Sequence, residues 1–326
     1  MSLIGIANRI AERAPLPDAL TLAGIGYIVG RSRRKLAASD GRVAEASFAA
    51  GMTDHPVAEF TADANAQHYE MPPEFFAAVL GPRRKYSSCF YEGAGVSLAA
   101  AEDKALDLTI LHADLSDGQD ILELGCGWGS LSLAMAARFP NSRVTAISNS
   151  HGQRRSIETA AAERGLGNLS VITADINNFI ADRRFDRIVS VEMFEHMANW
   201  PTLLGRLRLW MKPQGKLFLH VFSHRSTPYR FDHGDKANWI AQYFFTGGIM
   251  PSHGLIRQFQ SLFRVESEWR WSGEHYRRIA MDWLANFDRN RDAIKPILRE
   301  VYGADAGLWL RRWRIFFLAI AGLFGH

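Results

Sequence analysis

The sequence predicts an α/β protein built around a buried, mostly parallel β-sheet. From Asp120 onward, short runs rich in Val, Ile and Leu alternate with amphipathic helical stretches, a pattern typical of parallel strands joined by crossover helices. A glycine-rich turn follows the first of these runs, at the position where open α/β sheets bind ligands. The chain has 326 residues and is 47% hydrophobic, which is enough for one large core or two modest ones.

The order of elements divides the chain into two parts. Residues 1–115 show helical segments broken by Pro and Gly, so we expect an N-terminal helical cap, followed by the core over 116–326. The expected strands of the core are residues 121–124, 143–148, 169–173, 187–191, 216–222 and 264–271. Between the last two strands, residues 228–262 are predicted to form an inserted helical lid, and two long helical stretches, 275–301 and 306–324, end the chain.

Charge and cysteine content exclude several classes of function. The 38 Lys and Arg residues outnumber the 34 Asp and Glu residues by too little to indicate nucleic-acid binding. Cys89 and Cys126 cannot form a disulfide framework, and no signal peptide or membrane-spanning run is evident, so we expect a soluble cytoplasmic protein. Residues 31–35, which are basic, and residues 313–324, which are apolar, are either packing helices or peripheral membrane contacts.

The glycine-rich turn predicts the kind of ligand. Residues 123–129 read Glu-Leu-Gly-Cys-Gly-Trp-Gly after a short apolar strand, and glycines there let a ligand approach the backbone. A dinucleotide site needs G-x-G-x-x-G and an acidic residue about 20 positions later. Here the spacing is G-x-G-x-G and the next strand ends in Ser148, so pyrophosphate binding is disfavoured. Asp175 follows the third strand, where it either contacts a ligand or caps the next turn; both roles stay open.

Several motifs together resemble one family of methyltransferases. They are His68-Tyr69-Glu70, the run 85–91, the glycine turn, and the segments 150–153, 192–197, 243–248 and 273–276. They are similar to the cyclopropane fatty acid synthases and to the coclaurine and tetrahydroprotoberberine N-methyltransferases. The resemblance implies a Rossmann-like class I sheet that binds S-adenosyl-L-methionine (SAM) and releases S-adenosyl-L-homocysteine (SAH). By the resemblance, the family continues into a final apolar strand, and this sequence ends before it, which leaves a truncated chain, a substituting segment or a homodimer contact open.

The resemblance also implies which residues hold the donor. Those expected at its methionine end are Tyr69, Tyr86, Ser87, Gly125 and Gly127. Those expected at its ribose and adenine are Ser148, Gln153, Asp175 and Ile176. A buried Tyr or Gln often satisfies only a local hydrogen bond, so a structural role is the alternative at each position.

Three polar residues at the end of the fourth strand are candidates for the acceptor site. Glu192, Glu195 and His196 can together attract an ammonium ion and accept its proton. The alternative is that Glu195 and His196 cap a helix and pair with each other. The aromatic candidates for contact with the acceptor, of which about half are expected to belong to the core, are Phe90, Tyr91, Phe244, Phe245, Tyr276 and Trp283.

The nature of the acceptor separates the two branches of the family. By resemblance, cyclopropane synthases hold a bicarbonate base with a cysteine and with Glu, His and Tyr at positions matching Glu195, His220 and Tyr276. The cysteine position is Ser88 here, with Cys89 displaced by one, which weakens a bicarbonate site. We therefore expect N-methylation of a small, alkaloid-like amine. The alternatives are methylation or cyclopropanation of unsaturated phospholipid acyl chains, and an inactive SAM-binding scaffold.

Overall fold

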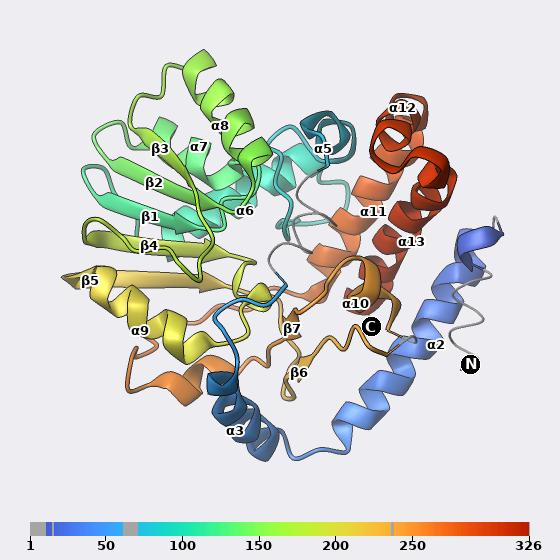
Figure 1. The fold of residues 1–326 in the computed structure, drawn as a ribbon, viewed down its shortest axis with the longest axis horizontal. Coiled ribbons are helices and arrows are strands. Elements are labelled where there is room, and N and C mark those ends of the chain that lie inside the picture. Colours follow the sequence, from blue (N-terminus) through green and yellow to red (C-terminus); the bar gives the residue numbers. More distant parts are fainter. Residues whose placement is uncertain (1–10, 15, 61–70, 236–237, 326) are drawn as a thin grey trace.

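Helices form the described N-terminal part of the chain. The computed structural model describes residues 11–14, 16–60, 71–235 and 238–325. The first helices are α2 (Asp18–Ala37), α3 (Gly41–Gly51), η1 (Met52–Asp54), α5 (Pro73–Val79) and α6 (Leu98–His112). Figure 1 shows α2 and α3 running along the lower edge of the molecule, whereas α6 lies against the sheet.

A five-stranded parallel sheet forms the core and confirms the predicted α/β class. Its strands are β1 (Asp120–Leu124), β2 (Arg143–Ser148), β3 (Leu169–Thr173), β4 (Phe185–Val191) and β5 (Met211–His220). Their order is β3-β2-β1-β4-β5, and every neighbouring pair is parallel. The chain order reverses beside β1, so the loops after β1 and β4 open a crevice at the carboxyl edge, the usual ligand position in such sheets.

Crossover helices cover both faces of the sheet. They are α7 (Ser130–Arg138), α8 (His151–Glu163) and α9 (Trp200–Trp210). On one face, Ile121 and Val144 pack against α6 and α7. On the other face, Leu122 and Ile188 pack against α9. Side-chain caps fix where the crossover helices begin, for example Ser150, whose hydroxyl accepts from the Gln153 amide.

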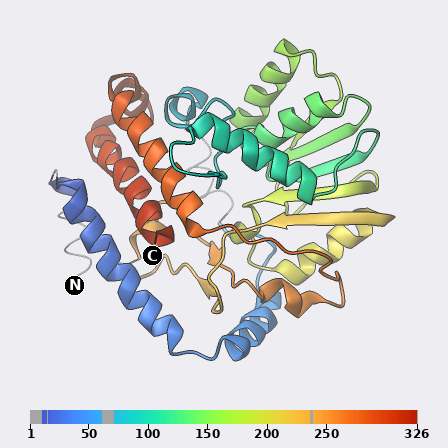
Figure 2. The same cartoon turned by 180° about the vertical axis from the view of Figure 1, so that it is seen from behind.

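A second layer of helices stands beyond the carboxyl edge of the sheet (Figures 1 and 2). Its members are α11 (Gly273–Arg289), α12 (Arg291–Tyr302), η5 (Gly303–Asp305) and α13 (Ala306–Phe324), and α5 packs with them around buried aromatic side chains. The single helix predicted over 275–301 is wrong, because the structure breaks it at Asn290. The Asn290 side-chain amide donates to the carbonyl of Ala78 at 2.7 Å, and this contact secures the break.

The predicted sixth strand over residues 264–271 is wrong, because these residues form no β-ladder. Instead, they contact β5 through their side chains. Glu266 lies 3.5 Å from the Lys216 ammonium, and the Trp271 ring is 4.7 Å from that of His220. The alternation of apolar and charged residues is typical of a strand, but alternation alone does not specify a ladder partner.

The segment 228–262 is less helical than predicted. It contains the short antiparallel strands β6 (Tyr229–Arg230) and β7 (Ile249–Met250), the five-residue helix α10 (Trp239–Tyr243) and the 3-10 helix η4 (Leu255–Phe259). Its many glycines and aromatics favour tight turns over a long helix. Among the described residues, no helix is both long enough and apolar enough to cross a membrane.

Candidate active site

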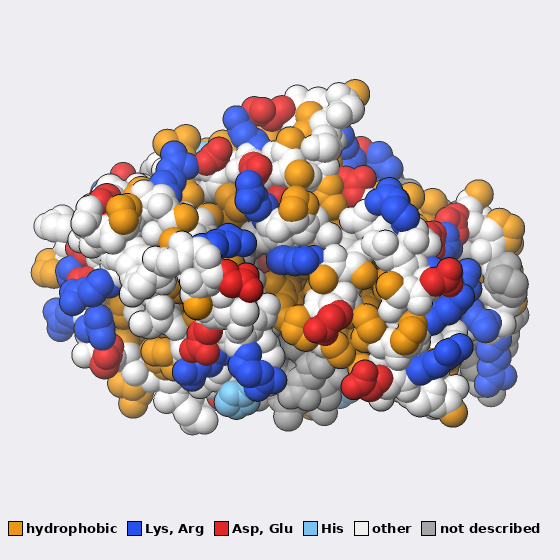
Figure 3. Space-filling view, turned by 90° about the horizontal axis from the view of Figure 1, so that it is seen from above, with side chains coloured by type: hydrophobic (Ala, Val, Ile, Leu, Met, Phe, Trp, Pro, Cys, Tyr) orange, Lys and Arg blue, Asp and Glu red, His pale blue; other side chains and the backbone are white. Residues whose placement is uncertain are grey.

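A cavity lies between the carboxyl edge of the sheet and the C-terminal helices. The glycine turn, the ends of β2 and β4, and residues of α11 and α13 contribute to its wall. Most predicted site residues that the structure describes line it, namely Tyr86, Ser87, Gly125, Gly127, Ser148, Gln153, Asp175, Ile176, Glu192, His196 and Tyr276. Figure 3 shows the molecule from above, with hydrophobic side chains in a central hollow and charged side chains around it. Tyr69 lies outside the described residues.

The glycine turn meets the cavity with its backbone. Gly125 has φ 76° and its amide donates to the Ile147 carbonyl at 3.0 Å. A Cβ on Gly125 would lie 2.8 Å from the Met193 side chain, so a larger residue does not fit there. At Gly127, which has φ 52°, no atom of the described residues other than its chain neighbours lies within 4 Å of the position of a Cβ. A ligand can therefore approach the backbone at Gly127 closely.

Glu123 lies directly beneath the turn and is almost fully buried. Its carboxylate accepts a short hydrogen bond from the Ser132 hydroxyl. Burial raises the pKa of Glu123 to about 7, although the Ser132 hydroxyl and the nearby charge of Lys85 oppose the shift. Glu123 therefore titrates near neutral pH, which makes its charge sensitive to a cationic ligand in the cavity.

Ser148 and Gln153 form a polar pair at the end of β2. The Ser148 hydroxyl donates to Gln153 Oε1 at 2.7 Å and accepts from the Ser150 amide at 3.0 Å. Gln153 Nε2 is buried on the cavity wall and has no hydrogen-bond partner within the described chain. A buried donor without an acceptor is costly, and a sugar hydroxyl in the cavity would satisfy it. These residues therefore fit the ribose of a nucleoside donor.

Asp175 and Ile176 line the cavity after β3. Asp175 Oδ1 also accepts from the Asn177 amide at 2.8 Å, so this carboxylate does cap the local turn. The capping role and a place on the cavity wall therefore coexist.

Tyr86 and Ser87 also line the cavity. The Tyr86 ring lies between Phe76, 5.1 Å away, and Trp283, 5.4 Å away. The Ser87 hydroxyl accepts from the Lys85 ammonium at 2.5 Å. The Tyr86 ring therefore packs between two aromatic rings, and the Ser87 hydroxyl accepts from a charged donor.

Lys85 is a residue of the wall that sequence reasoning missed. Only 4% of its surface is exposed, and its ammonium donates to Ser87 Oγ and to the Ser88 carbonyl at 2.7 Å. Its charge opposes the burial-driven rise in the pKa of Glu123 and of Glu192. In the sequence, Lys85 follows Arg83 and Arg84 and resembles part of an exposed basic run, so only the fold reveals its burial.

Glu192 is held by two donors at the end of β4. Its Oε1 accepts from the Ser88 amide at 2.9 Å, and its Oε2 accepts from the Tyr276 hydroxyl at 2.7 Å. Its own amide donates to the His220 carbonyl at 2.8 Å, with a backbone φ of 51° that is unusual for a residue other than glycine. Burial raises the pKa of Glu192, against the lowering influence of Lys85 and both donors.

Glu195 and His196 occupy different positions relative to the cavity. Glu195 is fully buried and does not line the wall; its Oε1 accepts from the Phe222 amide at 2.6 Å, while Oε2 has no hydrogen-bond partner among the described residues. Burial and the nearby Glu192 raise the pKa of Glu195 well above its ordinary value. His196 lines the wall beside the Phe245 ring, 4.5 Å away, and burial lowers its pKa to about 4. The wall of the cavity thus carries both a neutral imidazole, at His196, and the carboxyl of Glu192.

The positions matched to a bicarbonate site do not all meet at the cavity. Tyr276 is on the wall, but His220 packs against Trp271, and burial lowers its pKa to about 3. The Ser88 hydroxyl donates to the Cys89 carbonyl at 3.4 Å. The buried Cys89 thiol donates to the Ser87 carbonyl at 3.8 Å, and Cys89 is not a wall residue.

Half of the aromatic candidates reach the wall, namely Phe245, Tyr276 and Trp283. Phe244 is 2% exposed and stacks on Phe316 within the helical layer. The apolar wall also includes residues of α13 that the sequence did not single out, namely Phe316, Ile320, Leu323 and Phe324. Phe324 stacks on the Tyr276 ring at 4.2 Å, so the end of α13 helps to orient the tyrosine that donates to Glu192.

The chain matches one protein family over most of its length. The family model of the mycolic acid cyclopropane synthetases matches residues 58–321. The (S)-coclaurine N-methyltransferase of Thalictrum flavum subsp. glaucum is 36% identical over 265 residues, which are 80% of this chain and 73% of that protein. The cyclopropane-fatty-acyl-phospholipid synthase of Escherichia coli strain K12 is 28% identical over 265 residues, covering 77% of this chain and 66% of the synthase.

Solved structures show the same fold. A crystal structure of coclaurine N-methyltransferase bound to N-methylheliamine and SAH superposes with a TM-score of 0.92 at 31% identity, covering 100% of this chain and 96% of the other. The mycolic acid cyclopropane synthase CmaA1, complexed with SAH and CTAB, gives a TM-score of 0.63 at 21% identity and covers 80% of this chain and 96% of that one. The likeness to CmaA1 supports the fold alone.

Proposed function

Because the chain belongs to the mycolic acid cyclopropane synthetase family of SAM-dependent methyltransferases, we propose that it transfers a methyl group from SAM to the nitrogen of a small amine. The observation that carries the proposal is that the wall of one cavity holds both the Glu192 carboxyl, oriented by Ser88 and Tyr276, and the neutral imidazole of His196. The greater identity to an amine N-methyltransferase, 36% against 28% for an acyl-lipid enzyme, supports the same choice of acceptor.

The donor is assigned to the half of the cavity near the glycine turn. The backbone of Gly127 is accessible to a ligand. Gln153 Nε2 is a buried hydrogen-bond donor without a partner among the described residues, and a ribose hydroxyl could accept from it. The side of the site near Glu123 suits a positive charge, because a cation would stabilise the ionised form of a carboxyl whose pKa burial raises to about 7. When bound, SAM supplies a methyl group whose bond to sulfur breaks as the bond to nitrogen forms.

The acceptor is assigned to the half of the cavity near Glu192. An ammonium ion would be drawn to the Glu192 carboxylate, whose two oxygens are already oriented by Ser88 and Tyr276. The ammonium must lose a proton before its nitrogen can act as a nucleophile, and we assign this proton to the Glu192 carboxylate, whose pKa burial raises, with the neutral His196 imidazole on the same cavity wall. Phe245 and Phe324 keep this half of the cavity apolar and exclude water. Glu195, which does not line the cavity, holds the backbone at Phe222 by accepting from its amide.

The test is transfer of labelled methyl from SAM to a panel of secondary and tertiary amines, with unsaturated phospholipid vesicles as the competing acceptor. Glu192→Gln and His196→Ala should lower kcat/KM for the amines by about 10²- to 10⁴-fold, the usual contribution of an acid–base group. The matched control is Glu163→Gln at the exposed end of α8, which should leave the rate unchanged.

Two outcomes would overturn the proposal. One is unchanged amine methylation in both wall variants. The other is incorporation of label into acyl chains, with a rate that depends on added bicarbonate and with no amine product. The second outcome would select the acyl-lipid alternative, for which the apolar wall of α13 provides the only direct support among the described residues.

A further inference from the structure

The helix α2 presents an exposed stripe along one side. Leu20 and Tyr27 are 58% and 65% exposed, and Arg31, Arg34 and Lys35 follow on the same helix and are exposed as well. Steps of seven, four and three or four residues place these side chains on one side of a helix. The stripe is apolar toward the start of α2 and basic toward its end. No residue of α2 is buried, which is unusual for a helix of 20 residues.

The neighbouring start of α3 extends this stripe. Val43 is 65% exposed, and Arg42 beside it is exposed too. We call the set Leu20, Tyr27, Arg31, Arg34, Lys35, Arg42 and Val43 the elbow surface. In the part of the chain that the structure describes, none of its four basic side chains makes an ion pair.

Few carboxylates accompany this stripe. No Asp or Glu occurs between Asp18 and Asp40; Asp18 pairs with Arg314 of α13 at 2.5 Å, and Asp40 caps α3 by accepting from the Arg42 amide at 3.0 Å. The basic end of α2 is therefore a group of cations without an acidic residue on the same helix face, next to exposed apolar side chains.

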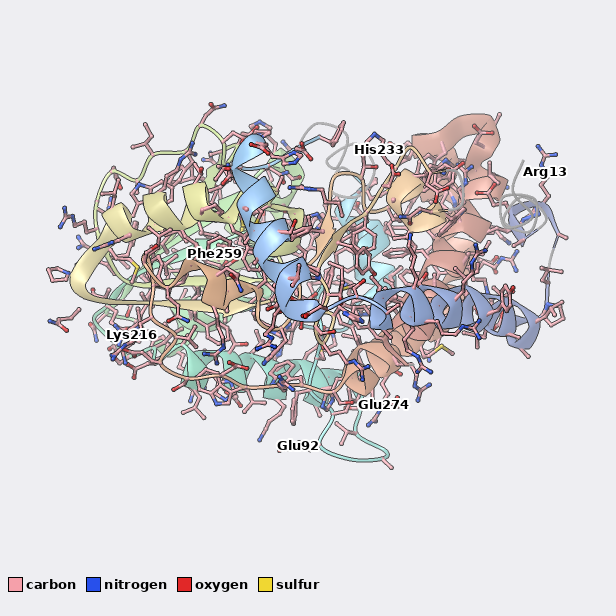
Figure 4. The ribbon with its side chains drawn as sticks, turned by 90° about the horizontal axis from the view of Figure 1, so that it is seen from below. Arg13, Glu92, Lys216, His233, Phe259 and Glu274 are labelled. Atoms are coloured by element: carbon pink, nitrogen blue, oxygen red, sulfur yellow. The ribbon has the colours of Figure 1, made fainter. Side chains whose placement is uncertain are left out.

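The elbow surface lies on an outer face of the molecule. Figure 4 shows α2 and α3 in front of the other elements when the molecule is seen from below. The opposite side of α2 packs on α13, where Gly322 leaves room for Ile25. Because α13 also carries Phe316, Ile320 and Leu323 on the cavity wall, one helix separates the elbow surface from the cavity.

We propose that the elbow surface docks the protein on an anionic lipid bilayer. Peripheral binding requires an apolar contact and a basic patch together, since neither suffices alone, and the elbow surface has both within 24 residues of chain. At 20 residues, α2 is roughly 30 Å long, which is enough to lie along the headgroup layer. The absence of acidic residues from the stripe favours lipid phosphates over a neutral surface. This inference does not depend on which acceptor the cavity takes.

The experiment is cosedimentation of the full chain with vesicles of phosphatidylcholine alone or mixed with phosphatidylglycerol. The triple variant Arg31→Gln/Arg34→Gln/Lys35→Gln should bind the mixed vesicles about 100-fold more weakly, since each basic residue strengthens partitioning by roughly fivefold. Leu20→Ser/Tyr27→Ser should weaken binding at high as well as low salt, because it removes the apolar contact. The matched control is Arg155→Gln/Arg164→Gln/Arg184→Gln, which removes the same charge from exposed positions around α8 and β3.

The expected pattern is binding of the natural chain and of the control to mixed vesicles, weakening with salt, and little binding to phosphatidylcholine. Equal binding to both vesicle types would refute the proposal, and so would an equal loss in the control, because net charge rather than the elbow surface would then drive the attraction. Thermal unfolding of each variant verifies that the fold is retained.

Discussion

Replacing Tyr276 by Phe removes one hydroxyl and keeps the ring that stacks on Phe324 at 4.2 Å. The lost hydroxyl donates to Glu192 Oε2 at 2.7 Å. A hydrogen bond to a charged group contributes about 1.5–3 kcal/mol, so kcat/KM for the amine should fall about 10- to 150-fold. The same loss should raise the already elevated pKa of Glu192 further, because the Tyr276 hydroxyl favours the ionised carboxylate. Because the acceptor binds to ionised Glu192, the acidic limb of the pH profile should move to higher pH.

The assay is kcat/KM for the amine as a function of pH, together with calorimetric titration of the donor. Donor affinity should stay unchanged, because Tyr276 contacts the acceptor side of the cavity. Tyr302→Phe is the control: its hydroxyl lies 3.3 Å from the Met71 sulfur in the helical layer, outside the cavity wall. If Tyr276→Phe left both the rate and the acidic limb where they are in the natural enzyme, Glu192 would not be the group that binds the acceptor.

Three further predictions follow from the same cavity. Gln153→Leu removes the unsatisfied Nε2 donor, so the Kd for SAM measured by calorimetry should rise about tenfold, which corresponds to the loss of one hydrogen bond. An unchanged Kd would show that Gln153 does not bind the ribose. Burial and Glu192 raise the pKa of Glu195, which favours its neutral form, so Glu195→Gln should keep kcat within about threefold, whereas Glu195→Ala, which leaves the Phe222 amide without its acceptor, should lower kcat at least tenfold. The pKa of Glu123 is raised from 4.5 to about 7, so its stabilising contribution is complete below about 4.5 and is lost as pH rises through about 7. Without donor, Glu123→Gln should abolish a decline of about 3 kcal/mol in the free energy of unfolding across that range, as measured by denaturant titration at several pH values.

The strands and the glycine turn could be predicted because their signals are local. The apolar run of β1 and the glycines at 125 and 127 specify a strand and a tight turn without reference to the rest of the chain. Residues 264–271 alternate between apolar and charged side chains, as many strands do. Whether such a segment joins a β-ladder depends on the sheet edge that it meets, and here side chains alone connect it to β5.

The site could be predicted only in part for a similar reason. Motif position located Glu192 and His196 on the wall, but burial depends on how distant segments converge. Lys85 follows two arginines in the sequence but is buried in the fold, where Glu102 of α6 accepts from its backbone amide at 3.2 Å. His220 lies in the strand expected over residues 216–222, which the structure ends at His220, and its ring packs on Trp271, a contact that no local pattern encodes.

The left-handed backbone at Glu192 has a consequence for anyone who would redesign the pocket. A residue with a Cβ costs roughly 1–2 kcal/mol in this conformation, and the hydrogen bond from its amide to the His220 carbonyl helps to hold it there. The backbone torsion thus fixes the direction in which the side chain leaves the chain. Glu192→Asp, which shortens the side chain by one methylene, would draw the carboxylate back from the cavity without changing that direction. A redesign for bulkier substrates should therefore begin at the carboxyl ends of β4 and β5, where the hydrogen bond from the Glu192 amide to the His220 carbonyl holds this torsion.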